Sequence, residues 1–313
     1  MKRIRPAVDE AIRPVGAMSR DGQPISYNRA PAPDLAPWIA RLYATVVEAP
    51  DGHRLSCGLF NDTAVLRIQV RGEWVADTAE GRLHHDRSAL FFGPNTRRMP
   101  VEVTGRFASF GIALRPGACE ALKCPRLADH LDRILPSDVC GIAQDKLMSA
   151  IQPDADPEES LIALEAILRE RIAQLHAREP DPITARFETL CFTDPSLPVS
   201  QFAEECGVDL RKLERIVRRD FGLPPKQVMR RARALDMASH LRGVADMSEA
   251  DELVLRYYDQ SHLIREFMAL FGMTPSQFVA TPQPILTLAL ESRQARRLEL
   301  IERIAPGAAR PWQ

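Results

Sequence analysis

Five charged residues on one short segment are of the types that contact nucleic acids. They are Arg211, Lys212, Glu214, Arg215 and Arg218. Arginine and lysine neutralise phosphates, arginine can donate two hydrogen bonds to guanine, and glutamate can accept one from cytosine. Residues 209–242 hold ten basic against four acidic side chains, a local balance of +6 in a chain whose formal net charge is -1. We therefore predict that this segment contacts DNA.

A second set of polar residues follows about 50 positions later and differs in charge. It consists of Gln260, Ser261, His262 and Arg265. Glutamine can read adenine, and arginine can meet guanine or a phosphate. Residues 243–280 nevertheless hold only two basic against six acidic side chains, a balance of -4 that repels a phosphate backbone. We expect weaker contacts from this set, or none.

The histidines and cysteines have the wrong spacing for a catalytic or metal site. His84 and His85 are adjacent, so on a strand they point to opposite faces, whereas one metal needs alternate residues. We expect both histidines to lie at the surface or in a turn. Cys119 and Cys124 are expected to be buried thiols. The six cysteines contain no Cys-x-x-Cys pair and are expected to stay reduced: Cys57, Cys119, Cys124, Cys140, Cys191 and Cys206. We predict no catalysis, no metal and no cofactor.

An internal repeat predicts the elements that position the charged residues. A shift of 50 places Asp209, Leu213, Arg215, Phe221, Gly222 and Pro225 on Asp259, Leu263, Arg265, Phe271, Gly272 and Pro275. In each copy the aspartate caps a helix, the leucine and phenylalanine lie on its inner face, the glycine ends it and the proline opens the next. Short helices are expected before each copy, at 199–206 and 248–255. This order predicts two helix-turn-helix units.

Two finer expectations follow from the repeat. In the first unit Leu210, Leu213 and Val217 are predicted to form the inner face of the helix. In the second, the spacing of Thr274 and Gln277 predicts a reciprocal capping box.

These segments resemble the AraC/XylS family of transcription regulators. The resemblance covers residues 183 to 281 and rests on GVDLRKLERIVRRDFGLPPKQ and YYDQSHLIREFMALFGMTPSQF. It implies that Arg215 packs or anchors a phosphate. Two positions depart from the family, because Arg256 stands where glycine is usual and Glu252 where alanine is usual. The segments GLFNDTAVLRIQV, FFGPN and GIALRPGA look like the family's cupin-like sensor domain, which implies a small effector, dimerisation or both.

The first half of the chain has the alternation of β-strands. Between Leu35 and Leu114 apolar and polar residues alternate, as around Leu66 and Ile68, and Gly- and Pro-containing turns separate the runs. This predicts a half-buried sheet in a β-sandwich or small barrel. Asp156 and Pro157 then predict the start of a helix that runs to about Arg178. Its apolar stripe suits a linker helix or a dimer seam, and packing on its own domain is favoured.

One more amphipathic helix is expected at residues 284–304. It carries Arg293, Arg296 and Arg297 among several leucines. We expect it to dock back on the protein, and the alternative is an accessory phosphate contact through the arginines.

The predicted fold class is α+β, with an N-terminal β-sandwich or cupin-like domain, a helical connector and a C-terminal all-α double helix-turn-helix domain. The expected divisions are an arm at 1–29, a β-rich domain at 30–125, a connector at 126–182, the DNA-binding domain at 183–281 and a helical extension at 282–313. The start of the chain lacks an apolar signal region and no apolar run spans a membrane, so we expect a cytoplasmic protein.

The predicted function is a sequence-specific, DNA-binding transcription regulator. Its expected partners are double-stranded operator DNA, with a small effector, RNA polymerase and a second copy as further candidates. Two alternatives stay open: a metal-dependent cupin-type enzyme with a helical appendage, and an interaction protein whose degenerate helix-turn-helix region no longer binds DNA.

Overall fold

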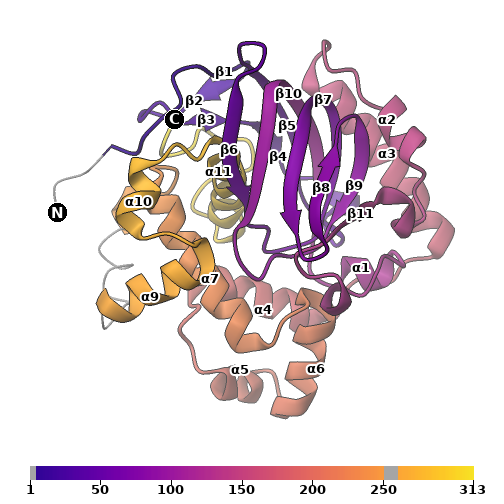
Figure 1. Ribbon diagram of the computed structural model, residues 1–313. Helices are drawn as coiled ribbons and strands as arrows, with labels where there is room; N and C mark the ends of the chain where they lie inside the picture. Colours follow the sequence, from indigo (N-terminus) through magenta and orange to yellow (C-terminus); the bar gives the residue numbers. More distant parts are fainter. Residues whose placement is uncertain (1–4, 250–259) are drawn as a thin grey trace.

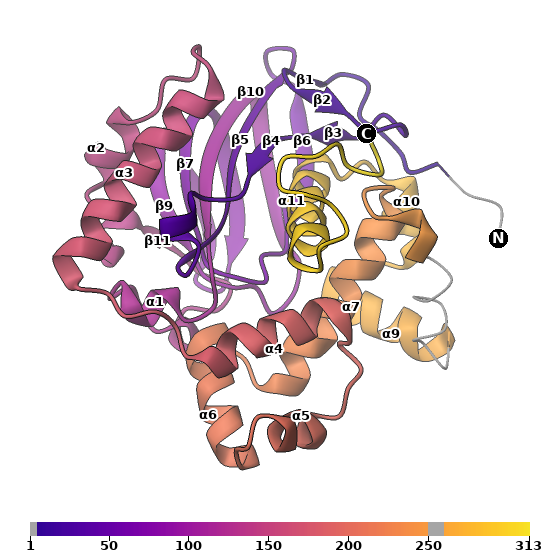
Figure 2. The same ribbon diagram turned by 180° about the vertical axis from the view of Figure 1, so that it is seen from behind.

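The N-terminal half of the computed structural model, which describes residues 5–249 and 260–313, is built on one antiparallel sheet (Figures 1 and 2). Its strand order is β1-β5-β10-β7-β9-β11, with β4 beside β5, β6 beside β10 and β8 beside β7. The strands are β1 (Arg13–Pro14), β4 (Tyr27–Arg29), β5 (Ile39–Glu48), β6 (Arg54–Leu59), β7 (Val65–Thr78), β8 (Gly81–His85), β9 (Ser88–Phe92), β10 (Met99–Leu114) and β11 (Ile134–Pro136). A separate ribbon pairs β2 (Ala17–Met18) with β3 (Pro24–Ile25).

The two longest strands bend the sheet into a barrel-like shape. β10 pairs with β6 over residues 99–104 and with β5 over 107–114, while β7 pairs with β9 and then with β8. Gly72 lies at the bend of β7 with φ 95°, and a Cβ there would lie 2.8 Å from the Cβ of Phe107. Only glycine fits this position without strain. The result is a curled single sheet, as in the predicted small barrel.

Both faces of the sheet are covered, which alternation alone did not predict. Leu66 and Ile68 face a core that includes α2 (Gln144–Ser149) and α3 (Pro157–Leu175). Arg67 and Gln69, which point to the other face, are buried as well. The expected half-buried sheet is therefore wrong, because α11 (Pro284–Leu300) lies against the second face (Figure 2).

The stretch predicted as a helical connector is only partly helical. It contains β11, which pairs with β9 and extends the sheet, followed by α2 and α3. The side chain of Asp156 caps α3 as expected, and the leucines Leu161, Leu164 and Leu168 are buried against the sheet. The favoured expectation, that this helix packs on its own domain, is confirmed. α3 ends at Leu175, three residues before the predicted end, since His176 turns left-handed.

The C-terminal half contains two helical units joined by a long helix. Its elements are α4 (Pro182–Thr193), α5 (Val199–Glu205), α6 (Leu210–Phe221), α7 (Pro225–Leu241), η4 (Met247–Glu249), α9 (Gln260–Phe271) and α10 (Pro275–Ala280). The first unit has a core of its own. The predicted capping box of Thr274 and Gln277 opens α10. Most of the helix expected at 248–255 lies outside the described residues, as do Glu252 and Arg256.

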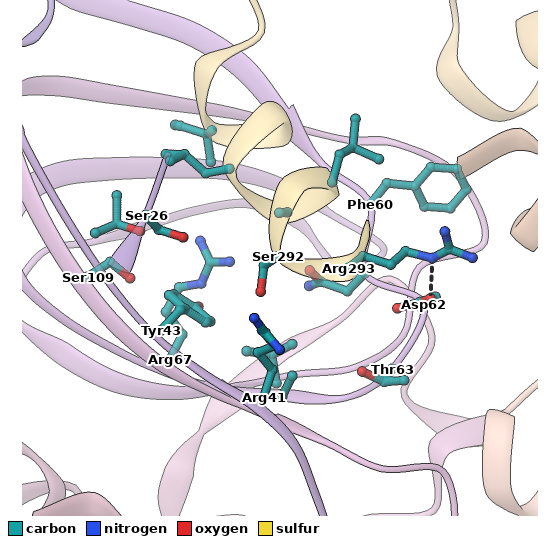
Figure 3. A pocket seen from close by; sticks show the side chains of 18 of the residues that line it. Ser26, Arg41, Tyr43, Phe60, Asp62, Thr63, Arg67, Ser109, Ser292 and Arg293 are labelled. Atoms are coloured by element: carbon teal, nitrogen blue, oxygen red, sulfur yellow. Dashed lines mark hydrogen bonds and ion pairs between the residues drawn. The ribbon is translucent and has the colours of Figure 1, made fainter. Parts of the chain in front are cut away.

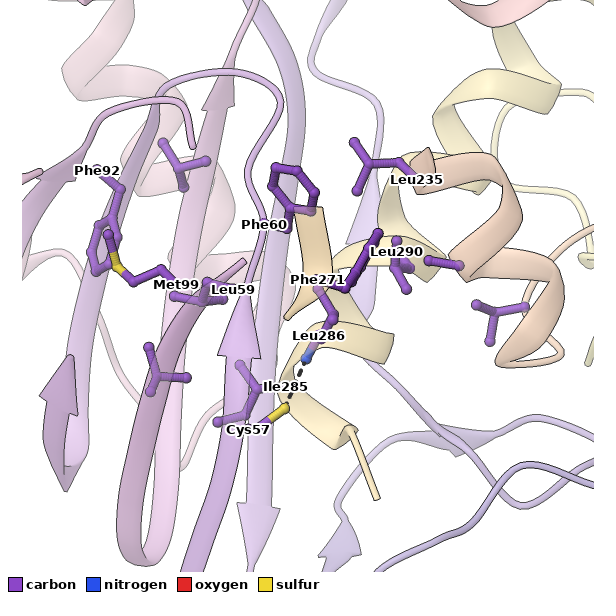
Figure 4. Packing of buried hydrophobic residues seen from close by; sticks show 14 of the residues in the cluster. Cys57, Leu59, Phe60, Phe92, Met99, Leu235, Phe271, Ile285, Leu286 and Leu290 are labelled. Atoms are coloured by element: carbon purple, nitrogen blue, oxygen red, sulfur yellow. Dashed lines mark hydrogen bonds between the residues drawn. The ribbon is translucent and has the colours of Figure 1, made fainter. Parts of the chain in front are cut away.

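The second unit shares its core with the β domain (Figure 4). Phe60, which follows β6, contacts Phe271 of α9 with ring centroids 5.2 Å apart. The backbone N–H of Leu286 in α11 lies 3.4 Å from the Sγ of Cys57 in β6. The β domain and the second unit therefore share one core, although they are far apart in the sequence.

The C-terminal helix docks back on the protein, as expected. Arg293 and Arg297 are buried, and Arg296 forms an ion pair with Glu188 of α4. The alternative, a phosphate contact through these arginines, is wrong because acids and carbonyls inside the protein already bind them. The helix ends at Leu300 instead of 304, and the following turns bring Trp312 back into the core.

Candidate nucleic-acid interface

The turn and cap that present α6 follow from the local sequence. α5, a turn at residues 206–209 and α6 form the first helix-turn-helix unit. Gly207 takes the left-handed backbone that the turn requires, with φ 66°. The side chain of Asp209 accepts a 2.7 Å hydrogen bond from the backbone N–H of Lys212, and Gly222 ends the helix with φ 77°. The predicted cap and stop are both confirmed.

The inner face of α6 holds the helix on its unit. Leu213, Val217 and Phe221 are buried, and the ring of Phe221 meets that of Phe187 in α4 at 5.3 Å. Leu210 was also predicted to face inward but is 47% exposed. It occupies the first turn of α6, where the helix protrudes beyond the core of its unit. The first turn is therefore free to enter a groove.

The outer face of α6 is a row of exposed cations. All five predicted residues of this set are exposed: Arg211, Lys212, Glu214, Arg215 and Arg218. In the described part of the chain, none of the four cationic side chains has an ion-pair or hydrogen-bonded partner. A cation that no internal acid neutralises keeps its full charge for a phosphate. Among the described residues, this face is the strongest candidate for DNA contact.

The local charge of +6 overstates the charge available to DNA. Arg231 and Arg242 are buried, and Arg219 pairs with Asp220 at 2.6 Å. Lys226 at the start of α7 is exposed and has no ion-pair partner within the described ranges. It was not among the predicted DNA-contact residues. Its signal was its position directly after the helix-opening Pro225.

The second unit presents a different surface on α9. Gln260, Ser261 and His262 begin this helix, and their side chains lie outside the described residues. Arg265 is exposed as predicted, between the exposed apolar side chains of Ile264 and Met268.

The negative charge of the second unit is partly internal. Glu266 turns inward and pairs with Arg230 of α7 at 3.1 Å, and Asp246 pairs with Arg303 at 2.9 Å. The repulsion of phosphates is thus smaller than the sequence count implied. The described outer face of α9 still has one arginine where α6 has three and a lysine.

The histidines and cysteines lie away from this face. His84 is exposed and His85 half-buried, so they point to opposite sides of β8 as predicted, although in a strand instead of a turn. Cys119 is buried as expected, whereas Cys124 is half-buried. Hydrogen bonds from the thiols of Cys119 and Cys140 lower the pKa of Cys124 well below its usual range. Across the described ranges, histidine, cysteine and acidic side chains form no group of three that could hold a metal ion.

Comparison with known proteins places two domains in this chain. Residues 202–281 match a helix-turn-helix domain family, and residues 27–136 match a domain family of unknown function. The second match includes β4 and β11, which lie outside the predicted 30–125. No curated protein matches the chain. None of the described helices has the length and hydrophobicity of a membrane span.

Three solved structures are similar to parts of this chain. ToxT from Vibrio cholerae is 8% identical, with 76% of this chain and 97% of that chain covered and a TM-score of 0.45. The AraC-like transcriptional activator CuxR is 15% identical over 62% and 76%, with a TM-score of 0.28. A cupin superfamily protein from Desulfitobacterium hafniense is 14% identical over 34% and 81%, with a TM-score of 0.21.

Proposed function

We propose that this DNA-binding transcription regulator of the AraC type binds its operator with α6 in the major groove. Its helix-turn-helix domain follows the β-rich domain in the chain. The observation that carries this proposal is the unpaired cationic face of α6. In a helix-turn-helix unit the second helix fits the major groove, and the side chains of its first turns reach base edges. Arg211, Lys212 and Glu214 lie on these turns, and Leu210 leaves the first turn uncovered.

The outer residues of α6 divide into two roles. Arg211 and Glu214 suit base edges, since arginine donates to guanine and glutamate accepts from cytosine. Arg215, Arg218 and Lys226 lie further along the unit and suit phosphates, which position the protein but carry little sequence information. Lys212 serves either role.

The second unit makes the smaller contribution to DNA affinity. Arg265 is its one cation on the described part of α9, and its exposed neighbours are apolar. Gln260, Ser261 and His262 begin α9 and stay proposed contacts. We expect the operator to contain one strongly specified half-site for α6 and a weaker one for α9.

The β domain is the proposed place of control. A cavity between its sheet and α11 suits a small effector. A second copy of the chain and RNA polymerase are further proposed partners. We also propose that the protein works in the cytoplasm and catalyses no reaction, as is typical of regulators of this type.

The test is selection of bound sequences from random duplex DNA at near-physiological salt. The parent chain is compared with the double variant Arg211→Ala, Lys212→Ala. Loss of one base contact costs about 1–3 kcal/mol of specific binding, and loss of one phosphate contact lowers the salt slope by about one. The control, Arg82→Ala with Arg87→Ala, removes the same charge from exposed positions in and after β8.

Enrichment of one sequence by the parent and the control, and its loss in the α6 variant, is the expected result. If no sequence is enriched, or if binding does not respond to salt, the chain is an interaction protein with a degenerate helix-turn-helix region. Equal losses in both variants would instead show that net charge, and not α6, drives binding.

A further inference from the structure

A cavity that is partly open to solvent lies between the β-sheet and the C-terminal helix (Figure 3). Its volume is about 90 Å³, which holds several water molecules or one compact ligand. Strands β5, β7 and β10 form its floor, and α11 forms its roof with Ile285, Leu290 and Ser292. In Figure 3 the polar side chains of Tyr43, Arg67 and Ser109 lie toward one end.

Neighbouring strands place two polar rows at the floor of this cavity, and Tyr43, Arg67 and Ser109 of these rows line it. In one row Tyr43 of β5, Gly111 of β10 and Arg67 of β7 are partners in register. A Cβ at Gly111 would lie 2.2 Å from the hydroxyl oxygen of Tyr43, so the tyrosine ring lies across the glycine toward Arg67. In the next row Ser109 is the partner of Gln69. Gly111 is thus the residue that lets Tyr43 and Arg67 share one site.

Several polar atoms of these rows are buried without a partner. They are the Tyr43 hydroxyl, the Ser109 hydroxyl, the Nε of Arg67 and both amide atoms of Gln69. Arg67 is 6% exposed and Ser109 2% exposed. A buried polar group that forms no hydrogen bond costs about 1–3 kcal/mol, more if it is charged. A bound group that accepts hydrogen bonds would recover the part of this free energy that belongs to the donors lining the cavity, Tyr43, Ser109 and Arg67.

Arg67 is the arginine of this cavity that lacks a counter-ion. Arg41 pairs with Glu299, Arg293 with Asp62 and Asp236, and Arg296 with Glu188. Within the described ranges Arg67 has no acidic partner, and its guanidinium instead packs over the rings of Tyr43 and Phe92, with Cζ to centroid distances of 5.7 Å and 5.0 Å. Cation–π contacts leave its N–H donors available.

The uncompensated charge of Arg67 reaches a neighbouring strand. Burial, and secondly the charge of Arg67, lower the pKa of His85 to about 4. A positive charge that an internal acid neutralised would exert a weaker effect on this imidazole.

We propose that this cavity binds a small aliphatic carboxylate, held by Arg67 and Tyr43. The proposal rests on the proposed function, because this ligand would be the effector of that regulator. The guanidinium and the phenol donate to the carboxylate, and Ser109 donates to any further polar atom of the ligand. Phe60, Ile285 and Leu290 supply apolar surface for a short hydrocarbon body, which a phosphate lacks.

The roof of the cavity connects it to the first helical unit and to the helix that joins the two units. Arg293 lines the cavity and pairs with Asp236 of α7, and Arg296 lines it and pairs with Glu188 of α4. A ligand that moves α11 must also move these ion pairs. Occupancy of the cavity is thereby transmitted to the first helix-turn-helix unit.

The test measures binding to the full chain by calorimetry and by thermal stability. The probes are acetate, propionate, butyrate and valerate, each compared with its uncharged amide, and inorganic phosphate. We expect at least one carboxylate to raise the melting temperature in a concentration-dependent manner, with no effect of its amide. Equal effects of acid and amide, a stronger effect of phosphate, or no effect of any carboxylate overturns the proposal.

Two variants locate the bound carboxylate. Tyr43→Phe removes one hydroxyl and should weaken binding by about 10-fold or more, the size expected for a hydrogen bond to a charged group. Arg67→Gln should abolish binding, while Arg82→Gln on the exposed face of β8 leaves it unchanged. If Arg67→Gln fails to fold, Tyr43→Phe still decides, because unchanged affinity in that variant overturns the assignment.

The same proteins, tested for DNA selection, separate the two proposals. Selected DNA binding without carboxylate binding refutes this inference alone. Carboxylate binding without any selected DNA sequence confirms the cavity and refutes the proposed regulator.

Discussion

Arg293 is predicted to be the strongest single link between α11 and the rest of the protein. Its side chain is 7% exposed and lies 2.8 Å from Asp62, after β6, and 2.5 Å from Asp236 of α7, which is 5% exposed. Its guanidinium also packs over the ring of Phe192 at 4.8 Å. Removal of one member of a buried ion pair costs about 3–5 kcal/mol, because the remaining charge stays buried without compensation. We expect Arg293→Met to destabilise the chain by this amount.

A double-mutant cycle separates the ion pair from the loss of packing. Asp236→Asn removes the opposite charge but keeps the shape, so the double variant should lose clearly less stability than the sum of the single variants. The control is Arg133→Met, which breaks an exposed pair with Glu80 at 2.8 Å. An exposed pair is worth at most about 1 kcal/mol.

The assay is urea unfolding followed by far-UV circular dichroism and by tryptophan fluorescence. Trp312 is buried, and its indole N–H donates to Glu291 of α11, so detachment of this helix changes its fluorescence on top of the signal from Trp38 and Trp74. Detachment of α11 alone would appear as a fluorescence transition before the dichroism transition. If Arg293→Met costs no more than Arg133→Met, or if the two single effects add, the buried pair does not hold α11 in place.

The pH dependence of the same variant follows from Asp62. Burial opposes ionisation of this carboxyl, but the charges of Arg293, Arg231 and Arg296 lower its pKa below the usual value. A lowered carboxyl pKa gives stability that is present above the unfolded pKa and is lost as the pH falls through the folded one. Arg293→Met should remove part of this acid-sensitive stability.

Three further outcomes are expected. Asp209→Ala removes the cap of α6 and should cost about 1 kcal/mol, measured by urea unfolding, while Asp209→Asn should restore most of it; equal losses would show that the cap contributes nothing. Burial lowers the pKa of His85 from 6.5 to about 4, so as the pH falls the unfolded state binds this proton before the folded state does. The free energy of unfolding should therefore decrease as the pH falls from 6.5 to about 4, and His85→Leu should reduce this decrease. An unchanged pH profile contradicts this. The thiol hydrogen bond from Cys119 lowers the pKa of Cys124, so iodoacetamide should modify Cys124 faster at neutral pH than Cys206, which is also half-buried but whose pKa burial raises. Preferential labelling of Cys206 would refute that order.

The sequence by itself determined the local structure of the DNA-binding half. Caps, stops and inner-face positions depend on residues within a few positions of one another, so Asp209, Gly222 and the pair Thr274 and Gln277 were sufficient to predict α6 and α10. The exposed cations of α6 were predictable for the same reason, since residues three and four apart share a helix face.

The tertiary structure decided which charged residues are available for binding. Arginines with similar neighbours in the sequence differ in exposure. Arg211 and Arg218 are exposed and unpaired, whereas Arg231 and Arg242 are buried. Only long-range packing separates them, because the acceptors for Arg231 and Arg242 come from segments more than a hundred residues away and from near the C-terminus.

The cavity could not be predicted from the sequence for a related reason. Alternation around Arg67 shows that it points away from Leu66 and Ile68, but not whether water or protein covers that second face. The cover is α11, which lies more than two hundred residues away in the chain. Local periodicity therefore determined the elements and their faces, and tertiary contacts decided that a polar strand face became the floor of a positively charged cavity.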